Sequence, residues 1–324
     1  MNTTDKEKEW LRRISGNNKQ TEHKETAVKE EVKEPEPPPE HKGNGFADIA
    51  GMNDLKQLVT EGFINVLKNK EMAKAYGLKP PSMLFYGPSG CGKTYFAEKM
   101  AEEVGIHFMK VVPDDIACKW VHGTQEKIAG VFGRAARKAP TLLFLDEFDA
   151  MVPKRSGDED GRTLDGEVNE FLCMMNNASD REIYVLAATN HPENIDRAIL
   201  RTGRIDEMVY IDMPDRESRK SLFTYELSKL PIEAVDTDRL AALTEGYNCS
   251  DISYIVKSAA RKTFNAAVMN NDGKMQAITQ KVLEESISAK SPSVTARDLR
   301  EYERVRNEFE PKSCSYRRAP IGFR

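Results

Sequence analysis

The sequence lacks the features that place a chain in a membrane or outside the cell. None of its apolar runs approaches the roughly 20 residues needed to cross a bilayer, and its first residues have no apolar secretory core. Its 5 cysteines are odd in number and far apart, with no C-x-x-C pair, so neither a disulfide framework nor a zinc or dithiol site is indicated. We therefore predict a cytoplasmic protein with reduced thiols and no transmembrane segment.

An excess of positive charge is also missing. The 324 residues carry a formal net charge of −4, so the overall balance does not indicate a nucleic-acid or membrane-surface protein. The zinc-protease motif H-E-x-x-H is absent from the sequence, and any proteolysis would need a separate partner. The length allows one large domain or two modest ones with a buried core.

The N-terminal residues 1–44 are predicted to be a disordered, charged and proline-rich tail. They contain too few apolar side chains to offset the entropy of ordering them. Only the segment Glu9–Ile14 has the pattern of a short amphipathic helix. It is either a frayed terminus or a hook for a partner or substrate.

From Phe46 onward, short apolar runs alternate with segments of helical periodicity, which favours βα units and a parallel sheet. The carboxyl ends of such strands meet at one crevice, so motifs far apart in the sequence can converge there. We place the strands at Ser82–Tyr86, His107–Val111, Thr141–Leu145, Ile183–Ala188 and Met208–Ile211.

The first of these strands runs into Gly87-Pro88-Ser89-Gly90-Cys91-Gly92-Lys93-Thr94, which fits the phosphate-loop pattern G-x-x-x-x-G-K-[ST] between a strand and a helix. Glycines let successive N–H groups point at a phosphate, and the helix adds the positive end of its dipole. Lys93 would neutralise the outer phosphates, and Thr94 would offer its hydroxyl to Mg²⁺. The alternative is a glycine-rich turn that merely connects strand and helix.

Two further strands end in polar side chains. Asp146 and Glu147 follow the strand Thr141–Leu145, where carboxylates near a core need a cation or donors. Asp146 would hold Mg²⁺ through its water shell, and Glu147 would orient and deprotonate the attacking water. Asn190, after the fourth strand, can hold a water and a phosphate oxygen together. The alternatives are a solvated strand-end turn and a routine turn asparagine.

Arg201 and Arg204 lie three residues apart around a glycine. Guanidinium groups suit bidentate phosphate contact, and an arginine from a neighbouring subunit can stabilise charge in the transition state. The alternative is a pair of surface salt bridges.

The order of these motifs resembles the classical AAA ATPases of the AAA+ superfamily, which include katanin, spastin, endosomal-sorting disassembly ATPases and the ATPase parts of membrane AAA proteases. Two more segments resemble that family. Phe46–Gly51 is similar to its segment beside the adenine, and Gly246–Ile252 is similar to its G-x-S-G-A-D-I stretch beneath the nucleotide. The resemblance covers about residues 46–290.

The resemblance implies an α/β fold, with a five-stranded parallel-sheet P-loop NTPase domain at 45–213, a small all-α lid at 214–290, and a C-terminal helix and tail at 291–324. It also implies a Mg²⁺-dependent ATPase that forms hexameric rings, in which Arg201 and Arg204 reach the next subunit's site. The catalytic residues would be these two arginines with Glu147 and Asn190. The implied contacts of ATP are Asp48, Ile49, Gly51, the loop residues from Pro88 to Thr94, Tyr95 and Asp146, with Mg²⁺ at Thr94 and Asp146.

Lys119, Trp120 and Val121 fall where the family has its substrate-gripping pore loop. A tryptophan at a loop tip can grip an unfolded chain through its area alone, although it can equally be a core anchor. His122 stands where the family usually has glycine, so the shape of the loop is open. The segment Ser156–Gly161 reads as a mobile second pore loop.

Other departures are smaller. Thr202 and Ile205 replace the Pro and Phe of R-P-G-R-F-D and should leave the arginine spacing intact. Ser250 or Asp251 can cap a helix beginning at Ile252. A T-x-x-D stretch at 295–298 resembles a capping box before a last helix that could dock on the large domain.

These observations favour ATP hydrolysis coupled to remodelling, unfolding or disassembly of a protein substrate by a ring-shaped oligomer. An ATP-controlled protein-binding scaffold without threading is the alternative. A DNA-directed AAA protein is disfavoured by the acidic balance and the lack of a recognisable DNA-binding element, so no nucleic-acid partner is expected. The motifs do not define the client, the role of the tails or the number of subunits.

Overall fold

The computed structural model describes residues 43–117, 123–154, 161–176, 178–201, 203–269 and 275–309. The predicted N-terminal tail up to residue 42, the pore residues Lys119, Trp120 and Val121, most of the second pore loop and the last 15 residues lie outside this part of the chain. The domain boundaries at 44, 213 and 290 stay predictions.

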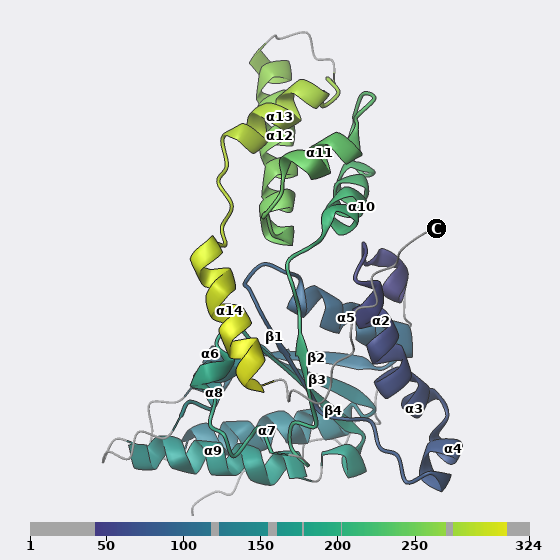
Figure 1. The fold of residues 1–324 in the computed structure, drawn as a ribbon. Coiled ribbons are helices and arrows are strands. Elements are labelled where there is room, and N and C mark those ends of the chain that lie inside the picture. The colour runs from purple at the N-terminus through teal and green to yellow at the C-terminus, as the bar shows by residue number, and fades with distance from the viewer. Residues whose placement is uncertain are drawn as a thin grey trace, which may run out of the picture. The chain divides into compact units, whose positions relative to one another are not determined.

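A parallel sheet of five strands lies at the centre of the fold (Figure 1). Its order is β2-β3-β4-β1-β5, and every neighbouring pair is parallel. The predicted fold class is confirmed, with strand ends that differ from the predicted ones by one residue at most. The strands are β1 (Met83–Tyr86), β2 (His107–Val111), β3 (Thr141–Leu145), β4 (Ile183–Thr189) and β5 (Glu207–Tyr210).

Helices cover both faces of the sheet, so all residues of β3 and β4 are buried and read as continuous apolar runs. On one face, α7 (Gly123–Arg137) and α9 (Gly161–Asn176) pack their apolar residues on the sheet. In α7 these are Ile128, Val131 and Ala135, spaced at helical intervals. On the other face lie α5 (Lys93–Val104) and the N-terminal helices, among them α2 (Asn53–Val59) and α3 (Asn65–Lys68).

Short elements complete this part of the chain. They are η1 (Gly45–Asp48), the π-helix η2 (Thr60–Ile64), α4 (Lys70–Ala75), α6 (Pro113–Ile116), α8 (Phe148–Met151), η3 (Ser179–Arg181) and η4 (Pro192–Asn194). No helix in the described ranges is both long and apolar enough to cross a membrane.

A third hydrophobic cluster holds the C-terminal helical region together, with Phe223, Leu240, Ile255 and Leu283 among its buried members. Its helices are α10 (Arg216–Leu227), α11 (Thr237–Leu243), α12 (Cys249–Met269) and α13 (Gln280–Ser288). Figure 1 shows them in green above the sheet.

The helix α12 begins three residues before the predicted start at Ile252, because Asn248 caps it. The Asp251 amide donates to Asn248 Oδ1 over 2.7 Å, and the Asn248 amide donates to Asp251 Oδ2 over 3.4 Å. This reciprocal pair is a capping box with the asparagine, rather than Ser250 or Asp251, in the first position.

The last helix, α14 (Ala296–Phe309), begins with the predicted capping box. Thr295 N donates to Asp298 Oδ2 over 2.9 Å, and Asp298 N donates to Thr295 Oγ1 over 3.2 Å. The helix contacts β5, where the Arg306 guanidinium lies 5.0 Å from the centre of the Tyr210 ring.

Candidate nucleotide site

The loop from Gly87 to Gly92 connects β1 to α5 and has a backbone that requires glycine. Gly87 has φ of 141°, and a Cβ there would lie 2.2 Å from the Ile211 carbonyl oxygen. Gly90 has φ of 73°, and its Cβ would lie 2.6 Å from Asn248 Nδ2. Close contacts with Ile211 and Asn248 therefore leave room only for glycine at these two positions of the curled phosphate loop.

Lys93, the first residue of α5, turns its amine back into this loop. Its Nζ donates to the carbonyl oxygens of Gly87 (2.9 Å) and Pro88 (2.8 Å), and the residue is buried. Burial lowers the pKa of the Lys93 amine to about 8, against the opposing effects of Cys91 and Asp146. The positive charge is costly here because both hydrogen-bond partners are neutral, so the site fits an anion.

Asp146 follows β3 and lies beside the loop, as predicted. Its Oδ2 accepts from Thr94 Oγ1 over 3.1 Å, and its Oδ1 accepts from the Glu147 amide over 3.1 Å. The hydroxyl and the carboxylate that were predicted to share Mg²⁺ are therefore adjacent, and hydroxyl and carboxylate oxygens are ligands that Mg²⁺ prefers. A third partner, Lys110 of β2, has its Nζ 2.8 Å from Asp146 Oδ2 and was not among the predicted site residues.

Glu147 and Asn190 follow the carboxyl ends of the neighbouring strands β3 and β4, at the same edge of the sheet. Glu147 is exposed, has φ of 51° and stands just before α8. Asn190 Oδ1 is buried and has no hydrogen-bond partner in the described part of the chain. A buried amide oxygen without a partner is costly, and a bound water or ligand donor would satisfy it.

Thr189, the residue before Asn190, is bonded to Asp149 in α8, which follows β3. The Thr189 hydroxyl donates to Asp149 Oδ1, and the His191 amide donates to Thr189 Oγ1 over 2.8 Å. Asp149 comes from the D-E-F-D stretch after β3 and was not predicted to act here. It holds the backbone on both sides of Asn190 in place.

The two predicted arginines lie in the connection between β4 and β5. Arg204 Nη1 donates to the Ala198 carbonyl over 2.7 Å, and the Arg204 amide donates to the Arg201 carbonyl. The Arg201 side chain is exposed. Among the described residues, no hydrogen bond or ion pair joins either arginine to the phosphate loop of the same chain.

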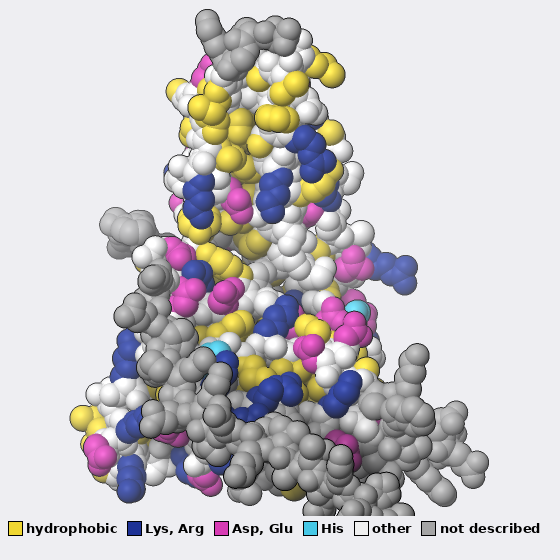
Figure 2. All heavy atoms as spheres, turned by 180° about the vertical axis from the view of Figure 1, so that it is seen from behind, with side chains coloured by type: hydrophobic (Ala, Val, Ile, Leu, Met, Phe, Trp, Pro, Cys, Tyr) yellow, Lys and Arg dark blue, Asp and Glu magenta, His cyan; other side chains and the backbone are white. Residues whose placement is uncertain are grey.

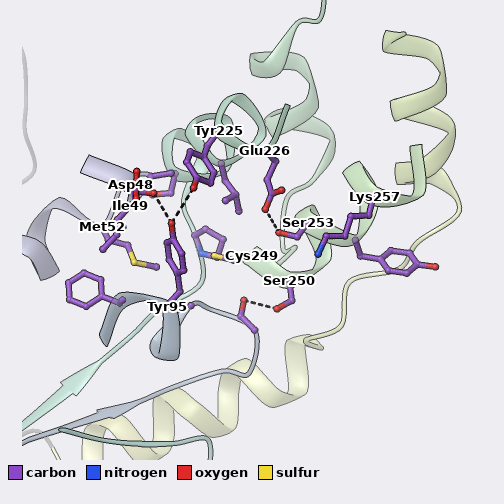
Figure 3. Close-up of a pocket in the computed structure, with 18 residues that line it drawn as sticks. Asp48, Ile49, Met52, Tyr95, Tyr225, Glu226, Cys249, Ser250, Ser253 and Lys257 are labelled. Atoms are coloured by element: carbon purple, nitrogen blue, oxygen red, sulfur yellow. Dashed lines mark hydrogen bonds between the residues drawn. The ribbon is translucent and has the colours of Figure 1, made fainter. Parts of the chain in front are cut away.

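A cavity of about 490 Å³ lies next to the loop, between η1, α5, α10 and α12 (Figure 3). Its size is in the ~300–1,000 Å³ range of small-molecule sites. The Tyr95 hydroxyl donates to the Asp48 carbonyl over 3.3 Å and lies 3.5 Å from the Tyr225 hydroxyl. Tyr225, Glu226, Ser253 and Lys257 also line it, although no motif marked them.

The predicted adenine segment forms one wall of this cavity. A Cβ at Gly51, where φ is 67°, would lie 2.1 Å from Ser218 Oγ, so glycine is needed for this approach. Lys56 Nζ donates to the Ile49 carbonyl over 2.7 Å. Lys99 pairs with Asp48 over 2.8 Å. These contacts fix the backbone of the segment beside the cavity.

One cysteine lies in the loop and a second lies at the start of α12. Cys91 is buried within the loop, and desolvation raises the pKa of its thiol to about 12. Desolvation also raises the pKa of the Cys249 thiol, at the start of α12, to about 11. Both thiols are therefore neutral near pH 7.

The start of α12 also supports the loop directly. Asn248 Nδ2 donates to the Ser89 carbonyl over 3.0 Å, and the Ser250 amide donates to the Gly90 carbonyl over 3.1 Å. The predicted stretch beneath the nucleotide thus contacts the phosphate loop, with asparagine as the main contact.

Comparison with known proteins agrees with this arrangement. Residues 83–213 match the ATPase family associated with various cellular activities (AAA). A cell division cycle protein 48 homolog of Archaeoglobus fulgidus is 32% identical over 275 residues, which are 82% of this chain and 38% of that protein. A putative ribosome biogenesis ATPase nvl of Dictyostelium discoideum is 31% identical over 287 residues, which are 84% of this chain and 33% of that protein.

The chain thus spans between a third and two fifths of the length of these two relatives. The match covers the sheet, the phosphate loop and the strand ends that carry Asp146 and Asn190. On the fold, the site and these similarities, the chain carries an ATP-binding domain of the AAA ATPase family.

Proposed function

We propose that this chain is a Mg²⁺-dependent ATPase that couples hydrolysis to the remodelling, unfolding or disassembly of a protein substrate. The observation that carries the proposal is the convergence of Lys93, Thr94, Asp146 and the buried oxygen of Asn190 at one edge of the sheet. The large domain at 45–213 and the lid at 214–290 would hold the nucleotide between them, in the cavity beside Tyr95.

Each residue then has a separate task. Lys93 binds the outer phosphates, whose negative charge compensates its buried ammonium. Thr94 and Asp146 hold Mg²⁺, which supplies charge neutralisation to the phosphates when bound. Glu147 accepts the proton of the attacking water, and Asn190 orients that water. Asp48 and Ile49 would form the wall against the base, and Gly51 allows the close approach of this segment to Ser218.

The positions of the two arginines favour assembly of the chain into a ring, most simply a homohexamer. Arg201 is exposed, and Arg204 donates to the Ala198 carbonyl. Neither is bonded to the phosphate loop of its own chain among the described residues, as expected if both serve a neighbouring subunit. Large apolar side chains are exposed near the end of α12, with Phe264 at 67% and Val268 at 60%, and Figure 2 shows hydrophobic side chains over this helical part. Exposed apolar surface of this kind favours subunit contact.

Threading of a substrate through the ring is part of the proposal and rests on Lys119, Trp120 and Val121. The odd number and wide spacing of the cysteines favour reduced thiols, so we place this activity in the cytoplasm. The competing function is a scaffold whose assembly is set by ATP and which threads nothing. The Trp120 variant described in the Discussion separates the two.

Nucleotide binding and turnover, measured on Glu147→Gln and Lys93→Ala, test the ATPase. Glu147→Gln should bind ATP with near-normal affinity and lose turnover, because an amide keeps the shape but cannot take the proton. Lys93→Ala should lose binding itself. Equal loss of ATP affinity in both variants would contradict this division of roles.

A further inference from the structure

Lys110 places a second lysine at the proposed metal site. It lies on β2, where it is paired in register with Phe144 of β3, two residues before Asp146. Its side chain is 42% exposed, whereas that of Asp146 is 22% exposed, and Lys110 Nζ is 2.8 Å from Asp146 Oδ2. The pair therefore joins a partly solvated cation to the carboxylate on which the metal would depend.

The two oxygens of Asp146 are not equally available. Oδ2 accepts a hydrogen bond from Thr94 Oγ1 and lies 2.8 Å from Lys110 Nζ in an ion pair. Oδ1 accepts from the Glu147 amide and keeps one lone pair. A metal ion that approached Oδ2, or a water bound to that ion, would therefore meet the Lys110 ammonium.

We propose that Lys110 is a positioning residue that orients Asp146 and competes with Mg²⁺ for it. This inference rests on the proposed function, since it assumes that Mg²⁺ and ATP bind at Thr94 and Lys93. Lys110 would weaken Mg²⁺ binding in two ways, by pairing with the carboxylate that would hold the ion and by placing like charge beside the ion. The same ammonium would attract the nucleotide's phosphates when no metal is present.

These two effects predict opposite changes in Mg²⁺ binding and in metal-free ATP binding, which a purely structural ion pair does not predict. Removing the charge of Lys110 should strengthen Mg²⁺ binding to the nucleotide complex and weaken binding of metal-free ATP. A surface ion pair without this role would shift neither quantity. The site as found therefore depends less on Mg²⁺ than the same site with a neutral residue at 110.

The test measures binding of a fluorescent, non-hydrolysable ATP analogue to the full chain, so that activity plays no part. Mg²⁺ is titrated at fixed analogue, and analogue is titrated in EDTA. Lys110→Met removes the charge and Lys110→Arg keeps it. Lys79→Met is the matched control, because Lys79 pairs with Asp180 over 2.7 Å before the amino ends of β1 and β4, away from the site.

In Lys110→Met, we expect half-saturation at a roughly three- to tenfold lower Mg²⁺ concentration and a similar loss of affinity in EDTA, given the partial exposure of the pair. Lys110→Arg should resemble wild type, and Lys79→Met should leave both quantities unchanged. In an Asp146→Asn background, Lys110→Met should have a smaller effect on the Mg²⁺ dependence, because only the repulsion between the ammonium and the ion is then removed.

An unchanged or higher Mg²⁺ requirement in a Lys110→Met protein with wild-type melting temperature would overturn the inference. So would an equal shift in Lys79→Met, or a shift that stays undiminished with Asp146→Asn. If Lys110→Met does not fold, Lys110→Gln with the same titrations decides. A wild-type chain that binds no analogue would refute the proposed function as well, whereas Mg²⁺-dependent binding lost in Lys93→Ala with no effect at Lys110 refutes this inference alone.

Discussion

Asp251 should be the most costly single carboxylate to neutralise in the helical region. Its side chain is 2% exposed and pairs with Lys290 Nζ over 2.8 Å. It also accepts from the Ser293 amide over 2.9 Å, from the Ser293 hydroxyl and from the Asn248 amide. One carboxylate thus joins the start of α12 to the segment that leads into α14.

Asp251→Asn keeps the volume of the side chain, so no cavity contributes to its effect. The amide removes the negative charge opposite Lys290. Its NH2 group also replaces an acceptor oxygen with a donor, which then faces groups that already donate. Breaking a mostly buried, hydrogen-bonded pair of this kind should cost about 2–4 kcal/mol of unfolding free energy, since Lys290 keeps some contact with solvent. At about 2–4 °C per kcal/mol, the melting temperature should fall by about 4–16 °C.

The pH dependence has a definite sign. Burial opposes ionisation of Asp251, but the donors from Lys290, Ser293 and Asn248 outweigh it, so the folded pKa is lowered from 3.8. The stabilisation is therefore fully present above that unfolded value and is lost as the pH falls through the lower folded pKa. The difference in stability between wild type and Asp251→Asn should shrink below pH 3.8.

Thermal unfolding of both proteins at pH 7 and at pH 3 measures this. Asp238→Asn is the control, because Asp238 pairs with Arg216 over 2.6 Å but is 46% exposed, and its loss should cost no more than about 0.5 kcal/mol. An Asp251→Asn protein as stable as Asp238→Asn at pH 7 would refute the reasoning. A stability difference that grows on acidification would refute the assignment of the pKa shift.

Two further predictions concern the ring. Arg201→Ala or Arg204→Ala should leave nucleotide binding nearly intact and lower turnover by roughly 10³-fold or more, the scale of arginine fingers. Mixing either variant with Lys93→Ala should restore some ATPase activity; no rescue in verified mixed rings would favour a finger in cis or a structural salt bridge. Trp120→Ala removes ~150–250 Å² of apolar surface per subunit, so basal ATPase activity should persist while substrate processing is lost. Unchanged processing would rule out threading, and a destabilisation of about 3–5 kcal/mol would place the tryptophan in a core.

The sheet could be predicted from the sequence because its information is local. Buried parallel strands are continuous apolar runs, and the phosphate loop is a contiguous pattern whose glycines are required by their φ values and close neighbours. Asp146 and Asn190 follow from position alone, since each comes directly after such a run. Parallel strands then bring these ends to one edge.

Lys110 could not be predicted in the same way. Its partnership with Asp146 depends on the register of β2 against β3 and on their adjacency in the sheet, which no single segment encodes. The predicted start of α12 was wrong because three neighbouring residues, Asn248, Ser250 and Asp251, all have side chains that can cap a helix, and only the folded backbone shows that Asn248 does so. Tyr225 and Lys257 reach the cavity only through the packing of the helical region.

The hydrogen bond from Asn248 to the Ser89 carbonyl connects the phosphate loop to the start of α12. Any movement of α12 that lengthens this bond changes the free energy of the loop, and any ligand that reshapes the loop changes the free energy of the bond. Linkage requires the two effects to be equal. The factor by which ATP alters the equilibrium constant for making this bond is therefore the factor by which making the bond alters the affinity for ATP.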